Sequence, residues 1–265
     1  MAAAMRSVLF AAGLSVAVSC FIVQPAAAAL LAAAETGDTP AALSAIDSGS
    51  DVNLRGSDGS TALMWAAYNG DAELVEALIA AGADVAAKNE FGTTAITEAA
   101  IIGNTSIIAA LLEAGADPDT RNPEGETPLM AVARTGNIEA AKSLLAAGAD
   151  VNASERWGGQ SAVMWAAAQA HAEMIALLAE HGADLDARGV VRQWARKIIT
   201  EPRPKDMNKG GFTPLLYAAR EGCIECARVL IDNGADPDLA DPERVSPLVM
   251  SILNMHFDFA AYMIE

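Results

Sequence analysis

The chain has 265 residues and a formal net charge of −17, from 34 acidic and 17 basic side chains. This excess of carboxylates argues against binding to nucleic acid or to an anionic membrane surface, because phosphate groups are held by lysine and arginine. Hydrophobic residues make up 52% of the chain but aromatic residues only 5%, so any core is built largely from small side chains, which suit thin helices packed in layers.

The first 29 residues differ from the rest. Arg6 is the only charged residue before an almost unbroken apolar run at 8–23, and alanines follow at 26–29. This order is typical of a secretory signal peptide, with cleavage after Ala28 or Ala29. The 16-residue run is shorter than the roughly 20 residues that a membrane-spanning helix needs. We therefore expect export to the periplasm or the medium, with no membrane attachment after cleavage.

The remainder of the chain is repetitive. The triplet Gly-Ala-Asp, once Gly-Ser-Asp, begins at residues 49, 82, 115, 148, 182 and 234, in steps of 33, 33, 33, 34 and 52. A second triplet, such as Thr127-Pro128-Leu129, keeps the same rhythm and has the composition of a helix start. Gly136 lies between the two triplets of its unit and divides that unit into two short helices, and most other units have a glycine at the same place. Helices below about 12–15 residues are marginal alone, so the units must stack.

The period also predicts the domain organisation. A degenerate N-terminal capping repeat occupies 30–56, and an insertion occupies 190–209. The full and partial repeats lie at 57–89, 90–122, 123–155, 156–189, 210–241 and 242–265. The last one ends without its exit triplet, which predicts that the chain is a fragment of a longer protein. An unmatched apolar face is expected there, made of Phe257, Phe259, Ala260, Tyr262 and Met263.

The repeated pattern is Gly-x-Thr-Pro-Leu-x-x-Ala-x-x-x-Gly, then a second helix and Leu-Leu-x-x-Gly-Ala-Asp. Residues 125–132 and 136–150 carry it most cleanly, and residues 211–236 nearly as well. In this pattern the chain resembles an ankyrin-repeat protein. The resemblance implies an all-α solenoid of stacked helix-turn-helix repeats with short β-hairpin loops. The family's histidine after Thr-Pro-Leu is replaced throughout, by Met64, Thr97, Met130, Met164, Leu216 and Val249.

The resemblance further implies a function in protein–protein recognition. In ankyrin proteins the hairpin tips and the residues before the mid-repeat glycine line a concave binding surface. The corresponding partner-binding candidates here are Tyr68, Asn69, Glu90, Phe91, Ile101, Ile102, Arg134, Arg156, Trp157 and Arg220. Trp65, Trp165 and Tyr217 share another first-helix position, where we expect packing between repeats.

The insertion is locally basic on an acidic chain. Val190, Val191, Trp194 and Ile198 have helical spacing, which predicts a short amphipathic helix. The insertion could contact an acidic patch on a partner, or it could fold back on the acidic surface of the array itself. Its candidate contact residues are Arg192, Trp194, Arg196 and Lys197.

Cys223 and Cys226 are the only cysteines that remain after signal cleavage. Residues three apart on a helix lie about 5–6 Å apart, within reach of a disulfide, and an exported protein meets an oxidising compartment. A structural disulfide or a pair of buried thiols is therefore expected. The alternative function for this pair is thiol–disulfide redox chemistry, although the strand-helix-strand context of thioredoxin-like proteins is missing.

One row of carboxylates recurs with the repeat. Neighbouring members should stand about 8–10 Å apart, too far to share one metal ion, so we expect them to stabilise turns. The row comprises Asp84, Asp117, Asp150, Asp184 and Asp236. The sequence contains no nucleophile motif and no phosphate-binding loop. It predicts a non-catalytic scaffold for a protein partner, without metal, cofactor or small-molecule substrate. A second alternative is the regulatory or targeting part of a longer enzyme.

Overall fold

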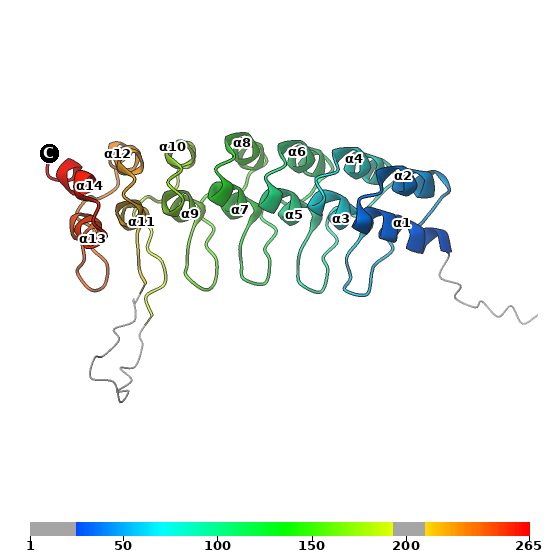
Figure 1. Ribbon diagram of the computed structural model, residues 1–265, viewed down its shortest axis with the longest axis horizontal. Coiled ribbons are helices and arrows are strands. Elements are labelled where there is room, and N and C mark those ends of the chain that lie inside the picture. Colours follow the sequence, from blue (N-terminus) through cyan, green and yellow to red (C-terminus); the bar gives the residue numbers. More distant parts are fainter. Residues whose placement is uncertain (1–24, 193–209) are drawn as a thin grey trace, which may run out of the picture.

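The computed structural model describes residues 25–192 and 210–265, and within them it is a single row of fourteen helices stacked in pairs (Figure 1). The predicted all-α solenoid is therefore confirmed. The pairs are α1 (Pro25–Thr36) with α2 (Thr39–Asp47), α3 (Ala62–Tyr68) with α4 (Ala72–Ala80), α5 (Ala95–Ile102) with α6 (Thr105–Glu113), α7 (Pro128–Thr135) with α8 (Ile138–Ala146), α9 (Ala162–Ala168) with α10 (Ala172–Glu180), α11 (Pro214–Glu221) with α12 (Ile224–Asp232), and α13 (Pro247–Leu253) with α14 (Phe257–Tyr262).

The pairs form two layers. From α3 onward the odd-numbered helices lie in one layer and the even-numbered helices in the other, and the long loops project from the odd-numbered layer (Figure 1). Within each layer every helix packs against the equivalent helix of the next repeat, as α5 packs on α7 and α6 on α8. A helix of six to nine residues is unstable by itself, so this stacking supplies most of its stability.

The first helix of each repeat begins where the Thr-Pro-Leu triplet predicts. The hydroxyl of Thr61 accepts the backbone N–H of Met64, and Thr127 caps Met130 in the same way. Proline follows the cap in α7, α11 and α13, where its missing N–H leaves no helical hydrogen bond unmade. The capping position therefore fixes the register of each repeat.

The residues that replace the family histidine are mainly packed side chains. Met64, Met130, Met164 and Leu216 are all buried in the layer of first helices. Thr97 instead completes a capping box, since its hydroxyl oxygen accepts the backbone N–H of Thr94 at 2.8 Å. Apolar packing therefore occupies four of the six imidazole positions and a local hydrogen bond occupies a fifth, whereas Val249 at the sixth is 42% exposed.

The recurrent aspartates stabilise turns, as predicted. The Asp84 carboxylate accepts the backbone N–H of Ala86 at 3.0 Å, and every equivalent aspartate accepts the N–H two residues ahead. Neighbouring turns are also joined, because Asn152 accepts the backbone N–H of Asp184 and donates to the Gly182 carbonyl. The carboxylate row is therefore part of the scaffold.

The loops fold back on themselves as hairpins but contain no β-strand within the described ranges, only the isolated bridges Ser154–Ser161 and Val191–Gly210. Single backbone hydrogen bonds join neighbouring loops, such as Glu90 N–H to the Asp58 carbonyl at 2.9 Å and Arg156 N–H to the Glu124 carbonyl at 2.8 Å. At the same position Pro123 and Pro242 have no N–H to donate. The ladder is interrupted before it can become a sheet.

At the N-terminal end, the predicted signal residues 1–24 lie outside the described part of the chain. Helix α1 begins at Pro25, so the expected cleavage positions Ala28 and Ala29 fall in its first turn, just before the buried Leu30. None of the helices in the described residues is long and apolar enough to cross a bilayer.

The C-terminal end differs from expectation. Phe259 is 1% exposed and Ala260 is also buried, because α14 packs on α12 and α13, so these two residues are matched after all. Tyr262 and Met263 are partly buried and also pack against the core, so of the five residues only Phe257 is exposed as predicted. The other large apolar side chains exposed at this end are Val249, Ile252, Leu253, Met255 and Ile264.

Candidate protein-binding face

The first helices and the loops of successive repeats share one side of the solenoid, which we call the first-helix face. Two positions three residues apart repeat along it, so their side chains form parallel rows. The inner row is Trp65, Glu98, Ala131, Trp165, Tyr217 and Met250. The outer row is Tyr68, Ile101, Arg134, Ala168, Arg220 and Leu253.

Near its N-terminal end the face holds a cavity of about 380 Å³, which we call the aromatic cavity. The Trp65 and Tyr68 rings meet edge to face with centroids 5.9 Å apart. Tyr68 is 55% and Phe91 64% exposed, so much aromatic surface is open to a ligand. The principal lining residues are Asp58, Met64, Trp65, Tyr68, Phe91 and Glu98.

Two carboxylates in the aromatic cavity have different surroundings. Asp58 accepts the backbone N–H of Ser60 at 3.0 Å and its hydroxyl at 2.8 Å, and these bonds lower the pKa of Asp58. Burial raises the pKa of Glu98, because desolvation penalises its charged form. No other described residue forms a hydrogen bond or an ion pair with the Glu98 carboxylate.

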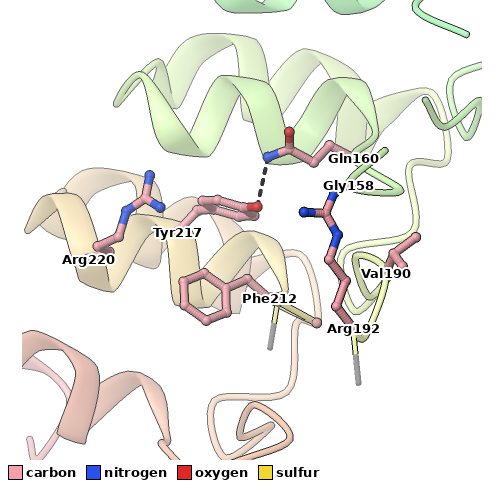
Figure 2. A pocket seen from close by; sticks show the side chains of 9 residues that line it. Gly158, Gln160, Val190, Arg192, Phe212, Tyr217 and Arg220 are labelled. Carbon is pink, nitrogen blue, oxygen red and sulfur yellow. Dashed lines mark hydrogen bonds between the residues drawn. The ribbon is translucent and has the colours of Figure 1, made fainter. Parts of the chain in front are cut away.

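Near the C-terminal end, a smaller cavity of about 200 Å³ has the opposite chemistry, and we call it the arginine cavity (Figure 2). Figure 2 shows the Tyr217 ring between Arg220 on one side and Gln160 and Arg192 on the other. The Gln160 side-chain N–H donates to the Tyr217 hydroxyl oxygen at 2.7 Å. The Arg220 guanidinium lies 5.0 Å from the centre of the Tyr217 ring, a cation–π contact.

The remaining contacts hold the arginine cavity in shape. Phe212 packs edge to face on Tyr217 with centroids 5.5 Å apart, and Arg192 donates to the Trp157 carbonyl oxygen at 2.6 Å. Burial raises the pKa of Tyr217, although the Gln160 hydrogen bond and the Arg220 charge oppose that effect. With Gln160 as donor, the Tyr217 O–H can donate to a ligand. Arg220, which pairs with Glu221 at 2.8 Å, adds positive charge beside it, and this suits an anionic or carbonyl acceptor.

Between the two cavities the face is apolar and then cationic. Ile101 and Ile102 are 49% and 46% exposed, as predicted for contact residues. Arg134 lies 5.6 Å from the centre of the Trp165 ring in the next repeat, and the buried indole N–H of Trp165 has no partner among the described residues. Trp165 therefore packs between repeats, and it leaves one donor for which the structure supplies no acceptor.

The structure groups some of the predicted contact residues and separates others. Tyr68 and Phe91 meet in the aromatic cavity, and Arg192 and Arg220 meet in the arginine cavity. Glu90 and Trp157 are exposed in the hairpin loops. Trp194, Arg196 and Lys197 lie outside the described residues, as does most of the helix expected in the insertion.

Two predicted contact residues also join repeats to one another. The Asn69 side chain donates to the Ala34 carbonyl at 2.8 Å, and Arg156 donates to the Pro123 carbonyl at 3.2 Å. Glu98 is not among the contact residues predicted from the sequence, and Trp65 and Tyr217 are predicted only to pack between repeats. One feature of the sequence does distinguish Glu98: it is the only charged residue in the inner row, whose other members are aromatic or apolar.

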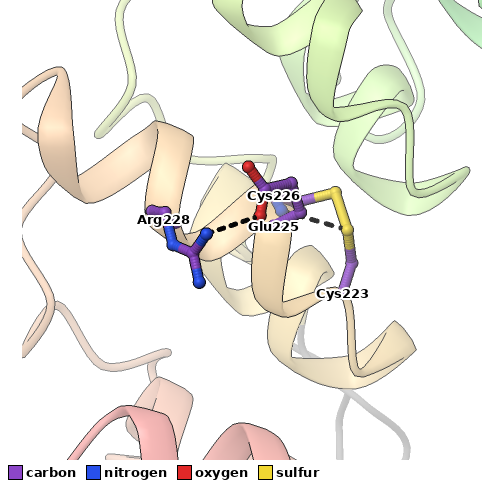
Figure 3. The surroundings of a disulfide bond; sticks show 4 residues. All are labelled: Cys223, Glu225, Cys226 and Arg228. Carbon is purple, nitrogen blue, oxygen red and sulfur yellow. Dashed lines mark hydrogen bonds and ion pairs between the residues drawn. A yellow bond between two sulfur atoms is a disulfide. The ribbon is translucent and has the colours of Figure 1, made fainter. Parts of the chain in front are cut away.

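The cysteine pair lies at the start of α12, in the opposite layer (Figure 3). The sulfur atoms of Cys223 and Cys226 are joined at 2.00 Å, and their Cα atoms are 5.2 Å apart. Cys223 is the N-cap residue, and its sulfur accepts the backbone N–H of Cys226 at 3.1 Å. Cys226 is buried in the position that Leu74, Ile107, Ala140 and Met174 occupy in other repeats. In the described ranges no cluster of three or more His, Cys, Asp or Glu side chains could hold a metal ion.

Comparison with known proteins assigns the chain to a family. The family profile described as Ankyrin repeats (3 copies) matches residues 29–122 and 96–189, and the profile described as Ankyrin repeat matches residues 210–242. Together they cover most of the chain. The chain therefore belongs to the ankyrin-repeat family.

Individual relatives share only short stretches. The chain is 37% identical over 67 residues to human Ankyrin repeat family A protein 2, which is 25% of this chain and 21% of that protein. It is 34% identical over 58 residues to the Ankyrin repeat and KH domain-containing protein mask-1 of Caenorhabditis elegans, which is 22% of this chain and 2% of that protein. The matched stretches thus span less than a quarter of the length of these relatives.

The solenoid also resembles a solved structure. The crystal structure of the human ASB11 ankyrin repeat domain superposes with a TM-score of 0.69 at 23% identity, covering 87% of this chain and 96% of that one. At this identity the similarity establishes the fold alone. It agrees with the architecture of the described helices.

Proposed function

We propose that the protein is a non-catalytic scaffold that binds an extended segment of a protein partner along the first-helix face. Ankyrin repeats generally serve as protein–protein interaction modules, which supports this class of function. The observation that carries the proposal is the set of exposed apolar side chains on this one face, flanked by the two cavities. It includes Tyr68, Phe91, Ile101 and Ile102. Exposed apolar groups gathered on one face commonly mark an interaction site.

The spacing of the cavities sets the size of the partner segment. Four steps along the inner row separate Trp65 from Tyr217, or about 30–40 Å at 8–10 Å for each packed helix. A fully extended peptide spans about 3.3–3.6 Å per residue. A segment of about ten to twelve residues would therefore reach both cavities.

A peptide library tests the proposal. Random twelve-residue peptides displayed on phage are selected on the immobilised protein, and the affinities of the selected peptides are measured by calorimetry. Replacing both Tyr68 and Phe91 with alanine should weaken the selected peptides at least tenfold. Glu139→Ala on the exposed side of α8 is the control, and it should leave their affinity unchanged. Equal binding to both variants would place the site elsewhere.

We also propose that the protein is exported and that the cysteine pair is a structural cross-link. The signal-like composition of residues 1–29 supports export. N-terminal sequencing of the protein from a bacterial periplasmic fraction should find Ala29 or Leu30 as the first residue. Recovery from the cytoplasm with residues 1–28 still attached would contradict export. The buried position of Cys226 supports a structural role for the pair.

A further inference from the structure

We propose that the aromatic cavity is a subsite for one cationic side chain, lysine or arginine, of the partner segment. This inference rests on the proposed function, which it deepens by naming the chemistry of the partner. It draws on three features of the cavity: its aromatic wall, the environment of Glu98, and the absence of any basic residue among those that line it.

The aromatic wall attracts positive charge. Trp65, Tyr68 and Phe91 come from one helix and the neighbouring hairpin, and all three line the same cavity. The faces of aromatic rings carry negative electrostatic potential, and a cation within about 6 Å of a ring centre gains roughly 0.5–2 kcal/mol, with tryptophan the strongest partner. Elsewhere on this face arginine side chains already make such contacts, with Trp165 and Tyr217. The Trp65 ring has no guanidinium over it among the described residues.

Glu98 supplies the counter-charge. The neighbouring carboxylates of the first-helix face are satisfied within the protein: Asp58 by Ser60, Glu126 by the Asn122 side chain, and Glu155 by three backbone N–H groups. Glu98 is half-buried and has no such partner in the described structure. A half-buried carboxylate without a partner costs stability, and a ligand cation would remove that cost.

The other side chains of the cavity exclude the competing ligand classes. No lysine or arginine lines it, so a carboxylate or phosphate would meet Asp58 and Glu98 without a positive partner. A purely apolar side chain would desolvate Glu98 further and leave it unpaired. The volume of about 380 Å³ exceeds the roughly 30 Å³ share of one water molecule tenfold, which leaves room for a long side chain.

The first test uses a small probe. N-acetyl-arginine methylamide is titrated into the labelled protein while the indole N–H signal of Trp65 is followed by nuclear magnetic resonance. We expect saturable binding in the millimolar range, and at least tenfold weaker binding for Glu98→Gln, which keeps the size of the side chain but removes its charge. Glu113→Gln, at the exposed end of α6 in the opposite layer, is the matched control and should bind as the wild type does.

The uncharged probe N-acetyl-norleucine methylamide completes this test. The inference requires that norleucine binds at least tenfold more weakly than arginine. Equal binding of the two probes, or unchanged arginine binding by Glu98→Gln, would overturn it. Thermal unfolding curves of Glu98→Gln and Glu113→Gln check that both variants are folded.

The peptide library separates failure of this inference from failure of the proposed function. Peptides selected on the wild type should contain a lysine or arginine at one fixed position, and that preference should disappear on Glu98→Gln. If peptides bind at the first-helix face without this preference, the inference of a subsite for a cationic side chain is wrong and the proposed function stands. If the arginine probe binds beside Trp65 but no peptide is selected, the proposed function is wrong and the chemistry of the cavity stands.

Discussion

The two cavities on the first-helix face are built from the same repeat positions and have opposite chemistry. In the aromatic cavity the inner row supplies Trp65 and Glu98, and no basic residue is present. In the arginine cavity the same row supplies Tyr217, with Arg220 and Arg192 around it. One or two side chains therefore set the charge of each cavity, while the backbone of the repeat stays the same.

This difference also shows that an acidic chain can carry a positively charged cavity. Although the chain has a net charge of −17, Arg192 and Arg220 both line the arginine cavity. At an ionic strength of 0.15 M charges are screened beyond about 8 Å, so a local cluster counts for more than the net charge.

The largest expected effect comes from filling the wall of one cavity. Gly211 has φ +73°, and an added Cβ would lie 2.8 Å from Pro242 and 2.9 Å from Val191. The left-handed backbone costs about 1–2 kcal/mol for alanine and overpacking adds a similar amount, so Gly211→Ala should lower the free energy of unfolding by about 2–4 kcal/mol. Urea unfolding followed by circular dichroism measures this change.

The equivalent glycine of the second repeat, next to Phe91 of the aromatic cavity, provides the comparison. At Gly92 the nearest atoms, in Pro123, are 3.0–3.1 Å away, and φ is +72°. Gly92→Ala should therefore destabilise less than Gly211→Ala. A larger loss for Gly92→Ala would mean that loop contacts other than these prolines determine the two sites.

The next effect should appear only in the repeat that contains the arginine cavity. Reducing the Cys223–Cys226 bond should lower stability by about 2 kcal/mol, the loop-closure value for a four-residue loop. Hydrogen exchange should show reduced protection in α11 and α12 but not in α5 and α6, whose second helix is capped by Asn104. A Cys223→Ser, Cys226→Ala variant should not respond to reductant. Thiol titration that finds two free thiols in exported protein would contradict the cross-link.

Removing one hydroxyl should have a smaller effect, confined to the arginine cavity. Tyr217→Phe leaves the Gln160 N–H without its acceptor and should cost about 1 kcal/mol in urea unfolding. Because the pKa of Tyr217 is raised on folding, the folded state retains this proton longer than the unfolded state does, and the stability of the wild type should fall as pH rises through and above 10. Absorbance at 295 nm would detect its titration. In Tyr217→Phe the part of the absorbance change at the highest pH should be lost, and loss of the part near pH 10 instead would contradict the burial of this hydroxyl.

The smallest effect should come from Glu98→Gln in the ligand-free protein. The pKa of Glu98 is raised above the model-peptide value of 4.5, so its contribution to stability is most favourable below that pH and declines as pH rises through the shifted value. At pH 7 the glutamine variant should be more stable than the wild type, by less than about 1 kcal/mol after solvent screening. Equal stability of the two proteins from pH 4 to pH 8 would show that Glu98 is well solvated.

Much of the fold could be predicted because it depends on local signals that recur. The Thr-Pro-Leu triplets set the helix starts, the Gly-Ala-Asp triplets set the turns, and the 33-residue step requires stacking. The sequence also pointed to Tyr68, Phe91, Arg192 and Arg220 as surface residues. It could not show that Tyr68 meets Glu98 or that Arg192 meets Tyr217, because the two members of each pair belong to different repeats or to the insertion.

Two further features, the burial at the C-terminal end and the absence of strands in the described hairpin loops, also depend on contacts between repeats. Phe259 and Ala260 were expected to be unmatched because the last repeat is short, but α14 reaches back to α12 and buries them. The predicted hairpins form without strands because Pro123 and Pro242 interrupt the hydrogen bonds between loops. In both cases the burial or hydrogen bonding of a segment depends on which neighbouring repeat it contacts.

The sequence by itself thus determined the family, the repeat length and the pairing of helices, since caps, turns and apolar periodicity act over a few residues. Only the tertiary structure decided which side chains share a cavity and which carboxylates are satisfied within the protein. Glu98 shows the reason most clearly. Its environment depends on residues 30 to 40 positions earlier in the chain, and only stacking of the repeats brings them to it.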